Sequence, residues 1–119
     1  MQWKLSDDRP IYVQLMETIT AAIASGTLAA GSRLPSVREM AAQAGVNPNT
    51  MQRALAELEA RGLLETQRTA GRTVTSDTEK LAQARQSLAR KLVHDFYRQA
   101  SALGLTKAEL AALLEQEEG

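Results

Sequence analysis

One face of a predicted helix carries side chains that could read the edges of nucleic-acid bases. Its residues recur at a spacing of three and four positions: Asn49, Gln52, Arg53 and Ala56. Asparagine and glutamine amides can form paired hydrogen bonds with adenine, and an arginine guanidinium can do so with guanine or bind a phosphate. A small alanine would let such a helix sit close to its target. A solvated amphipathic helix also has a polar outer face, so this stripe alone leaves both interpretations open.

The opposite face of the same segment indicates how the stripe would be held in place. Apolar residues recur there at helical spacing: Met51, Ala54, Leu55 and Leu58. Asn47 is a good N-cap, Pro48 suits the first helical position, and Gly62 is a suitable stop. The segment therefore predicts a helix that starts at Pro48, buries one face and closes at Gly62.

Two further helices are predicted before this one. The first begins near Pro10, continues with apolar residues at helical spacing and stops at Gly26. In the second, Ser36 and Glu39 form a predicted capping box and Gly45 ends the helix. Two short helices joined by a tight turn with a glycine have the shape of a helix-turn-helix, in which the second helix enters the DNA major groove.

Residues 63–75 favour the DNA-binding interpretation. Their apolar ends flank a glycine-containing turn, with Arg68 on one side and Arg72 on the other, which predicts a β-hairpin with a basic tip. Arg33 and Leu34 could add a very short strand. A helix-turn-helix followed by such a hairpin is a winged helix, and a wing lies along the phosphate backbone or the minor groove. A plain hairpin with two solvated arginines is the alternative, but it leaves the order of elements unexplained.

Composition excludes several other classes. The chain has 119 residues and no cysteine, which rules out disulfides, thiolate nucleophiles and thiolate metal sites. His94 is the only histidine and has no soft ligand or nucleophile near it in the sequence, so we expect no enzyme, no metal site and no cofactor. The N-terminus lacks a signal-peptide core and no apolar run could span a bilayer, so we expect a cytoplasmic protein without a membrane partner.

The order of these motifs resembles a known family. The strings "GSRLPSVREMA" and "VNPNTMQRAL", then "ELE" and "GL", resemble the N-terminal DNA-binding domain of GntR-family bacterial transcription regulators. The resemblance covers residues 9–75, well over half of the chain. The short C-terminal part looks like the YtrA-type subfamily, which lacks the large ligand-binding domain of most relatives.

The resemblance implies a sequence-specific DNA-binding regulator and places its contacts residue by residue. Contacts would come from the start of the second helix, from the third helix and from the wing tip: Ser36, Arg38, Asn47, Asn49, Thr50, Gln52, Arg53, Arg68, Thr69, Gly71 and Arg72. Many relatives have arginine where this chain has Pro48, and often where it has Gln52. The base sequence that those relatives read therefore does not carry over to this chain. The wing usually has glycine in place of Thr69, so the wing contacts transfer least directly.

Residues 76–119 predict two more helices. Ser76 and Glu79 form a predicted capping box for a long helix that runs to about Leu103, and Thr106 and Glu109 cap a last short helix. The apolar residues proposed for dimerisation are Leu81, Leu88, Leu92, Val93, Phe96, Tyr97, Leu103, Leu110, Leu113 and Leu114. Burying each large side chain is worth about 1.5–3 kcal/mol, and two helices can hardly cover so many of them. A second copy with two-fold symmetry is the expected cover, and the alternative is that the tail folds back on its own winged helix.

The predicted fold class is therefore mostly α (α+β), with a winged helix-turn-helix over residues 1–75 and a helical dimerisation segment over residues 76–119. The predicted function is a transcription regulator, expected to repress, that binds a palindromic operator in double-stranded DNA as a homodimer. The alternative is a winged-helix module that binds protein without specific DNA binding. The sequence assigns neither the operator nor a small-molecule effector.

Overall fold

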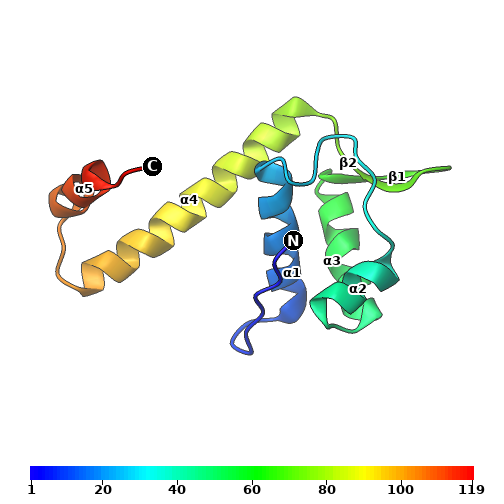
Figure 1. Ribbon diagram of the computed structural model, residues 1–119, viewed down its shortest axis with the longest axis horizontal. Coiled ribbons are helices and arrows are strands. Elements are labelled where there is room, and N and C mark those ends of the chain that lie inside the picture. The colour runs from blue at the N-terminus through cyan, green and yellow to red at the C-terminus, as the bar shows by residue number, and fades with distance from the viewer. The chain divides into compact units, whose positions relative to one another are not determined.

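The computed structural model describes residues 1–119 and divides into two compact units, residues 1–85 and 86–119 (Figure 1). The elements are α1 (Ile11–Ala24), α2 (Val37–Ala44), α3 (Pro48–Ala60), β1 (Leu64–Gln67), β2 (Gly71–Val74), α4 (Thr78–Ala102) and α5 (Lys107–Gln116). The predicted fold class, a mostly helical chain with a winged helix-turn-helix, is confirmed. Helix α4 begins in the first unit and continues into the second.

The core of the first unit lies between the inward faces of α1, α2 and α3. The apolar stripe predicted on α3 is buried throughout, with Met51 and Ala54 fully enclosed. Leu15 and Ile19 of α1 and Met40 of α2 belong to the same core, as do Leu64 and Val74 of the hairpin. Because three helices share these contacts, the polar face of α3 is turned outward.

The wing is an antiparallel hairpin with a third, very short partner. Strands β1 and β2 pair with Leu64 opposite Val74. On the other edge of β2, the Leu34 amide donates to the Arg72 carbonyl at 2.9 Å, and Arg33 forms a bridge with Thr73. The very short strand expected at Arg33 and Leu34 is therefore present, and it ties the chain before α2 to the wing.

Three predicted capping boxes have three different outcomes. Thr106 and Glu109 form the complete reciprocal box at the start of α5. At α2, Ser36 accepts the Glu39 amide, but the Glu39 carboxylate bonds to the Ser36 hydroxyl at 3.2 Å instead of to its backbone amide. The box predicted from Ser76 at the start of α4 is wrong. Asp77 is the cap, because its carboxylate accepts the amides two and three positions further on, at 3.0 and 3.2 Å.

A buried glutamine fixes the chain that leads into α1. Gln14 is 3% exposed, and its amide nitrogen donates to the carbonyls of Ser6 and Arg9 at 2.8 and 2.9 Å. Its side-chain oxygen accepts the Ser6 amide at 2.8 Å. Every strong bonding position of this amide is thus used, as a buried amide requires. The clasp holds the first turn of α1, including Tyr12, in one place.

The second unit buries little. In the long helix α4 only Ala100 is buried, and α5 has no buried residue. Leu92, Val93 and Leu103 are 62%, 67% and 81% exposed. Phe96, Leu113 and Leu114 are also exposed, whereas Tyr97, Leu88 and Leu110 are half-buried. No helix of the chain is both long and apolar enough to cross a membrane.

Candidate nucleic-acid interface

The outer face of α3 is exposed along its whole predicted stripe. Asn49, Gln52, Arg53 and Ala56 are all exposed, and Thr50 is half-buried. Asn47 caps the helix, since its side-chain oxygen accepts the Asn49 amide at 2.8 Å. Its amide nitrogen is not used by this cap. The first two turns of α3 therefore present amide and guanidinium donors on one surface, as base readout in a major groove requires.

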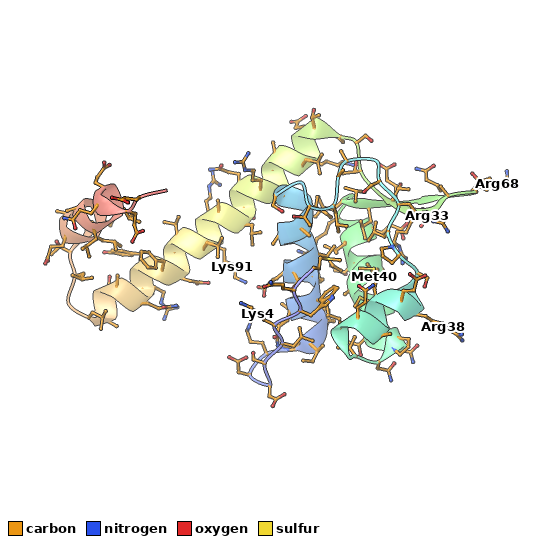
Figure 2. All side chains as sticks on the ribbon, viewed as in Figure 1. Lys4, Arg33, Arg38, Met40, Arg68 and Lys91 are labelled. Atoms are coloured by element: carbon orange, nitrogen blue, oxygen red, sulfur yellow. The ribbon has the colours of Figure 1, made fainter.

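Helix α2 offers one cation next to that helix. Arg38 is exposed in the first turn, and Figure 2 shows its side chain projecting away from α2. Ser36, the other residue predicted there, is exposed, but its hydroxyl serves the Glu39 amide as the N-cap. Ser36 thus orients the first turn of α2, and with it Arg38.

The wing divides its two arginines between different tasks. Arg68 is exposed at the hairpin tip, beside the exposed Thr69 and just before Gly71, whose φ of +75° is favoured by glycine. Arg72 is half-buried and its guanidinium lies 3.4 Å from the Glu59 carboxylate of α3. Arg72 therefore joins the wing to α3.

The Glu59 carboxylate is the centre of that junction. It accepts the Thr66 hydroxyl of β1 as well as the Arg72 guanidinium. The Thr66 hydrogen bond, with a smaller effect from the Arg72 charge, lowers the pKa of Glu59 below its ordinary value. The junction thus holds a negative charge next to Arg72, which reduces the net charge that Arg72 can offer elsewhere.

The arginines of residues 1–75 fall into two groups by their partners. Three form ion pairs within the chain: Arg9 with Glu17, Arg61 with Glu57, and Arg72 with Glu59. Four are exposed and form no ion pair with a carboxylate: Arg33, Arg38, Arg53 and Arg68. Figure 2 shows Arg38 and Arg68 projecting at the same edge of the unit, with Arg33 between them. Unpaired cations at one edge suit a polyanion.

Arg33 is a candidate that the predicted site residues missed. It belongs to the arginine-rich segment 33–72, and the bridge between Arg33 and Thr73 of β2 places it beside the wing. The Arg33 side chain lies beside Gly71 at the start of β2: a methyl group on the Gly71 Cα would be 3.8 Å from Arg33 Nε. Arg33 therefore lies against the wing, and a strand signal next to the predicted hairpin was the only hint of it.

The model of "Bacterial regulatory proteins, gntR family" matches residues 11–74, which include all three helices of the first unit and the wing. The chain belongs to the GntR family. Two curated relatives agree with this assignment. The uncharacterized regulator YhcF of Bacillus subtilis is 38% identical over 92% of this chain and 91% of its own. The repressor YtrA of the same organism is 37% identical over 59% of this chain and 54% of its own.

Solved structures extend the comparison beyond the winged helix. A regulator from Listeria monocytogenes has a TM-score of 0.84 at 38% identity and covers 96% of this chain and 100% of its own. The DNA-binding domain of AraR in complex with operator ORX1 has a TM-score of 0.54 at 30% identity, over 63% of this chain and 92% of its own. This chain is thus a short GntR-family transcription regulator of the YtrA type with a DNA-binding domain, and it is not an enzyme.

Proposed function

We propose that this GntR regulator is a homodimeric repressor that recognises a palindromic operator. Residues 1–75 serve as the DNA-binding domain and residues 76–119 as the dimerisation segment. In each copy α3 enters a major groove, where Asn49 and Gln52 read base edges. Arg33, Arg38, Arg53 and Arg68 anchor phosphates or guanines at that groove.

The observation that carries this proposal is the exposed outer face of α3, which includes Arg53, together with three further exposed arginines that form no ion pair: Arg33, Arg38 and Arg68. Three other arginines of the same unit have carboxylate partners at 2.8–3.5 Å. The exposed cations and the amides of α3 instead match the two needs of operator binding, which are phosphate anchoring and base readout.

The second unit supplies the reason for two copies. Leu92, Val93 and Phe96 of α4 are exposed, and so are Leu103, just after α4, and Leu113 and Leu114 of α5. An exposed apolar surface marks an interaction site, and a two-fold dimer is the commonest way to cover it. Leu81, by contrast, packs against the core of the first unit, so its packing does not depend on a second chain. A dimer holds two copies of α3 for two half-sites and, when bound over a promoter, would exclude polymerase.

Selection of bound duplexes from a random DNA pool tests the proposal directly. We expect an enriched palindrome with a fixed half-site spacing, bound with an affinity that falls steeply as salt rises. The matched control is the same selection with Asn49→Ala/Gln52→Ala, which should enrich weaker or altered half-sites. Weak binding to all duplexes with little dependence on salt would contradict the proposal and favour a winged helix that binds protein.

Repression is tested separately by transcription in vitro from a promoter that carries the selected site. Transcript yield should fall as the regulator occupies the site, and moving the site well upstream of the promoter should restore it. A rise in transcription would show an activator and would leave operator recognition intact.

A further inference from the structure

The cation that lies on the recognition face of α3 does not stand alone. The guanidinium carbon of Arg53 lies 3.7 Å from the centre of the Tyr12 ring of α1. This is well within the range of about 6 Å at which a ring attracts a cation. Arg53 remains exposed and forms no ion pair, so the tyrosine ring is its charge-stabilising contact within the chain. We propose that Tyr12 is a positioning residue that sets the side chain of Arg53 for DNA; this inference depends on the proposed operator recognition.

The support for Tyr12 is rigid. The ring is half-buried and packs against the core of the first unit, while α1 itself is held at its start by the Gln14 clasp. A free arginine side chain loses about 2 kcal/mol of rotamer entropy when it is fixed. Because the ring already holds the guanidinium in the free protein, part of that loss occurs before DNA binds. Tyr12 therefore improves affinity without touching DNA.

The stacking also determines which bonds Arg53 can make. A guanidinium that lies over a ring has one face covered, and its N–H donors point outward in its own plane. A target must then approach the edge of the plane and offer two acceptors, as guanine O6 and N7 or two phosphate oxygens do. Lysine could not replace arginine here, because an ammonium group has no planar pair of donors. Tyr12 thereby restricts Arg53 to paired contacts.

A double-mutant cycle on the selected operator tests the inference. Tyr12→Leu should weaken binding by about three- to fivefold, as expected when a cation–ring contact at an exposed site is lost. In an Arg53→Ala background the same Tyr12→Leu change should cause no further loss. Tyr12→Phe keeps the ring and should bind like the wild type. An equal loss from Tyr12→Leu in both backgrounds would show a structural role for Tyr12 and overturn the inference.

The stacking itself can be measured without DNA and without relying on a variant that must fold. In the NMR spectrum of the full chain, the side-chain protons of Arg53 should resonate upfield because they lie over an aromatic ring. Unshifted Arg53 signals in the wild type would overturn the inference whatever the binding data show. The matched control is Arg61, the C-cap residue of α3, which is paired with Glu57 and should resonate normally.

The outcomes also separate this inference from the proposed function. If the wild type selects a palindrome but Arg53→Ala binds it as tightly, the Tyr12 inference fails and operator recognition stands. If the wild type selects no sequence, both fail. A loss from Arg53→Ala that is equal on operator and random duplexes assigns the contact to phosphate, whereas a loss confined to the operator assigns it to a base.

Discussion

The two units of this regulator bury apolar side chains to opposite degrees. In the first unit, α1, α2 and α3 each contribute fully buried residues to one core, and the exposed face of α3 is polar. In the second unit, α4 buries only Ala100 and α5 buries none, although both helices are rich in leucine. The first unit is thus complete within one chain. The second is incomplete in the sense that Leu92, Leu103, Leu113 and Leu114 stay exposed within one chain.

The largest effect is expected from a cavity in the complete unit. Leu55→Ala in α3 removes a side chain that is 1% exposed, and such changes destabilise a core by about 2–5 kcal/mol. Urea unfolding should therefore show a much lower midpoint. Leu103→Ala is the matched control, because Leu103 is 81% exposed within its chain. If Leu103→Ala also lowered the free energy of unfolding by a large amount, in dilute solution where the chain is monomeric, the contrast between the two units would be wrong.

A charge in the incomplete unit should act on association instead of on folding. Phe96→Glu places a carboxylate in the exposed apolar surface of α4, and a residue central to an interface contributes about 2 kcal/mol or more. We expect the dimer dissociation constant to rise at least about thirtyfold in sedimentation equilibrium.

Ser87→Glu is the control for that experiment. It adds the same charge to an exposed position nine residues earlier, which lies on the opposite face of the helix. Ser87→Glu should leave the dimer intact. If both variants remain dimeric, the second copy does not cover this surface.

The sequence predicts periodic features of this molecule well and partners distant in the chain poorly. The buried and outer faces of α3 follow from spacing, because a helix repeats every 3.6 residues. The apolar stripe of α4 follows from the same argument, whereas its exposure within one chain does not. The cap of α4 was misplaced by one residue, since Ser76 and Asp77 are both good caps and only backbone geometry chooses between them.

The division of the arginines could not be predicted in this way. Arg72 meets Glu59 because the hairpin folds back onto α3, and Arg33 reaches the wing only through strand pairing with β2. Arg53 meets Tyr12 because α1 and α3 pack in one core. Each of these contacts depends on tertiary packing, which leaves no local pattern in the sequence. The sequence therefore predicts the type and position of the candidate contact residues. It does not predict which arginines form ion pairs within the chain and which do not.

Free and paired arginines of the first unit should differ in their effect on DNA binding. Arg38→Ala removes an unpaired cation and should cost about 1–3 kcal/mol if it makes a paired guanine contact. A phosphate contact would instead weaken binding to all sequences alike and lower the salt slope by about one. Arg61→Ala removes a cation that Glu57 already accompanies at 3.5 Å, and it should change affinity little. Fluorescence anisotropy at several salt concentrations measures both. Equal losses from the two variants would contradict the grouping by ion pairs.

The smallest effect concerns the start of α4, where the helix still belongs to the complete unit. The Asp77 carboxylate accepts two backbone amides, and Leu81, one turn further on, packs against the core. Removing an N-cap costs about 1 kcal/mol, so Asp77→Ala should lower the free energy of unfolding by about that amount. Ser76→Ala should leave the free energy near the wild-type value, because Ser76 does not cap the helix. Urea unfolding of the two variants at one protein concentration compares them directly. A greater loss from Ser76→Ala would restore the cap expected from the sequence and would move the start of α4 back by one residue.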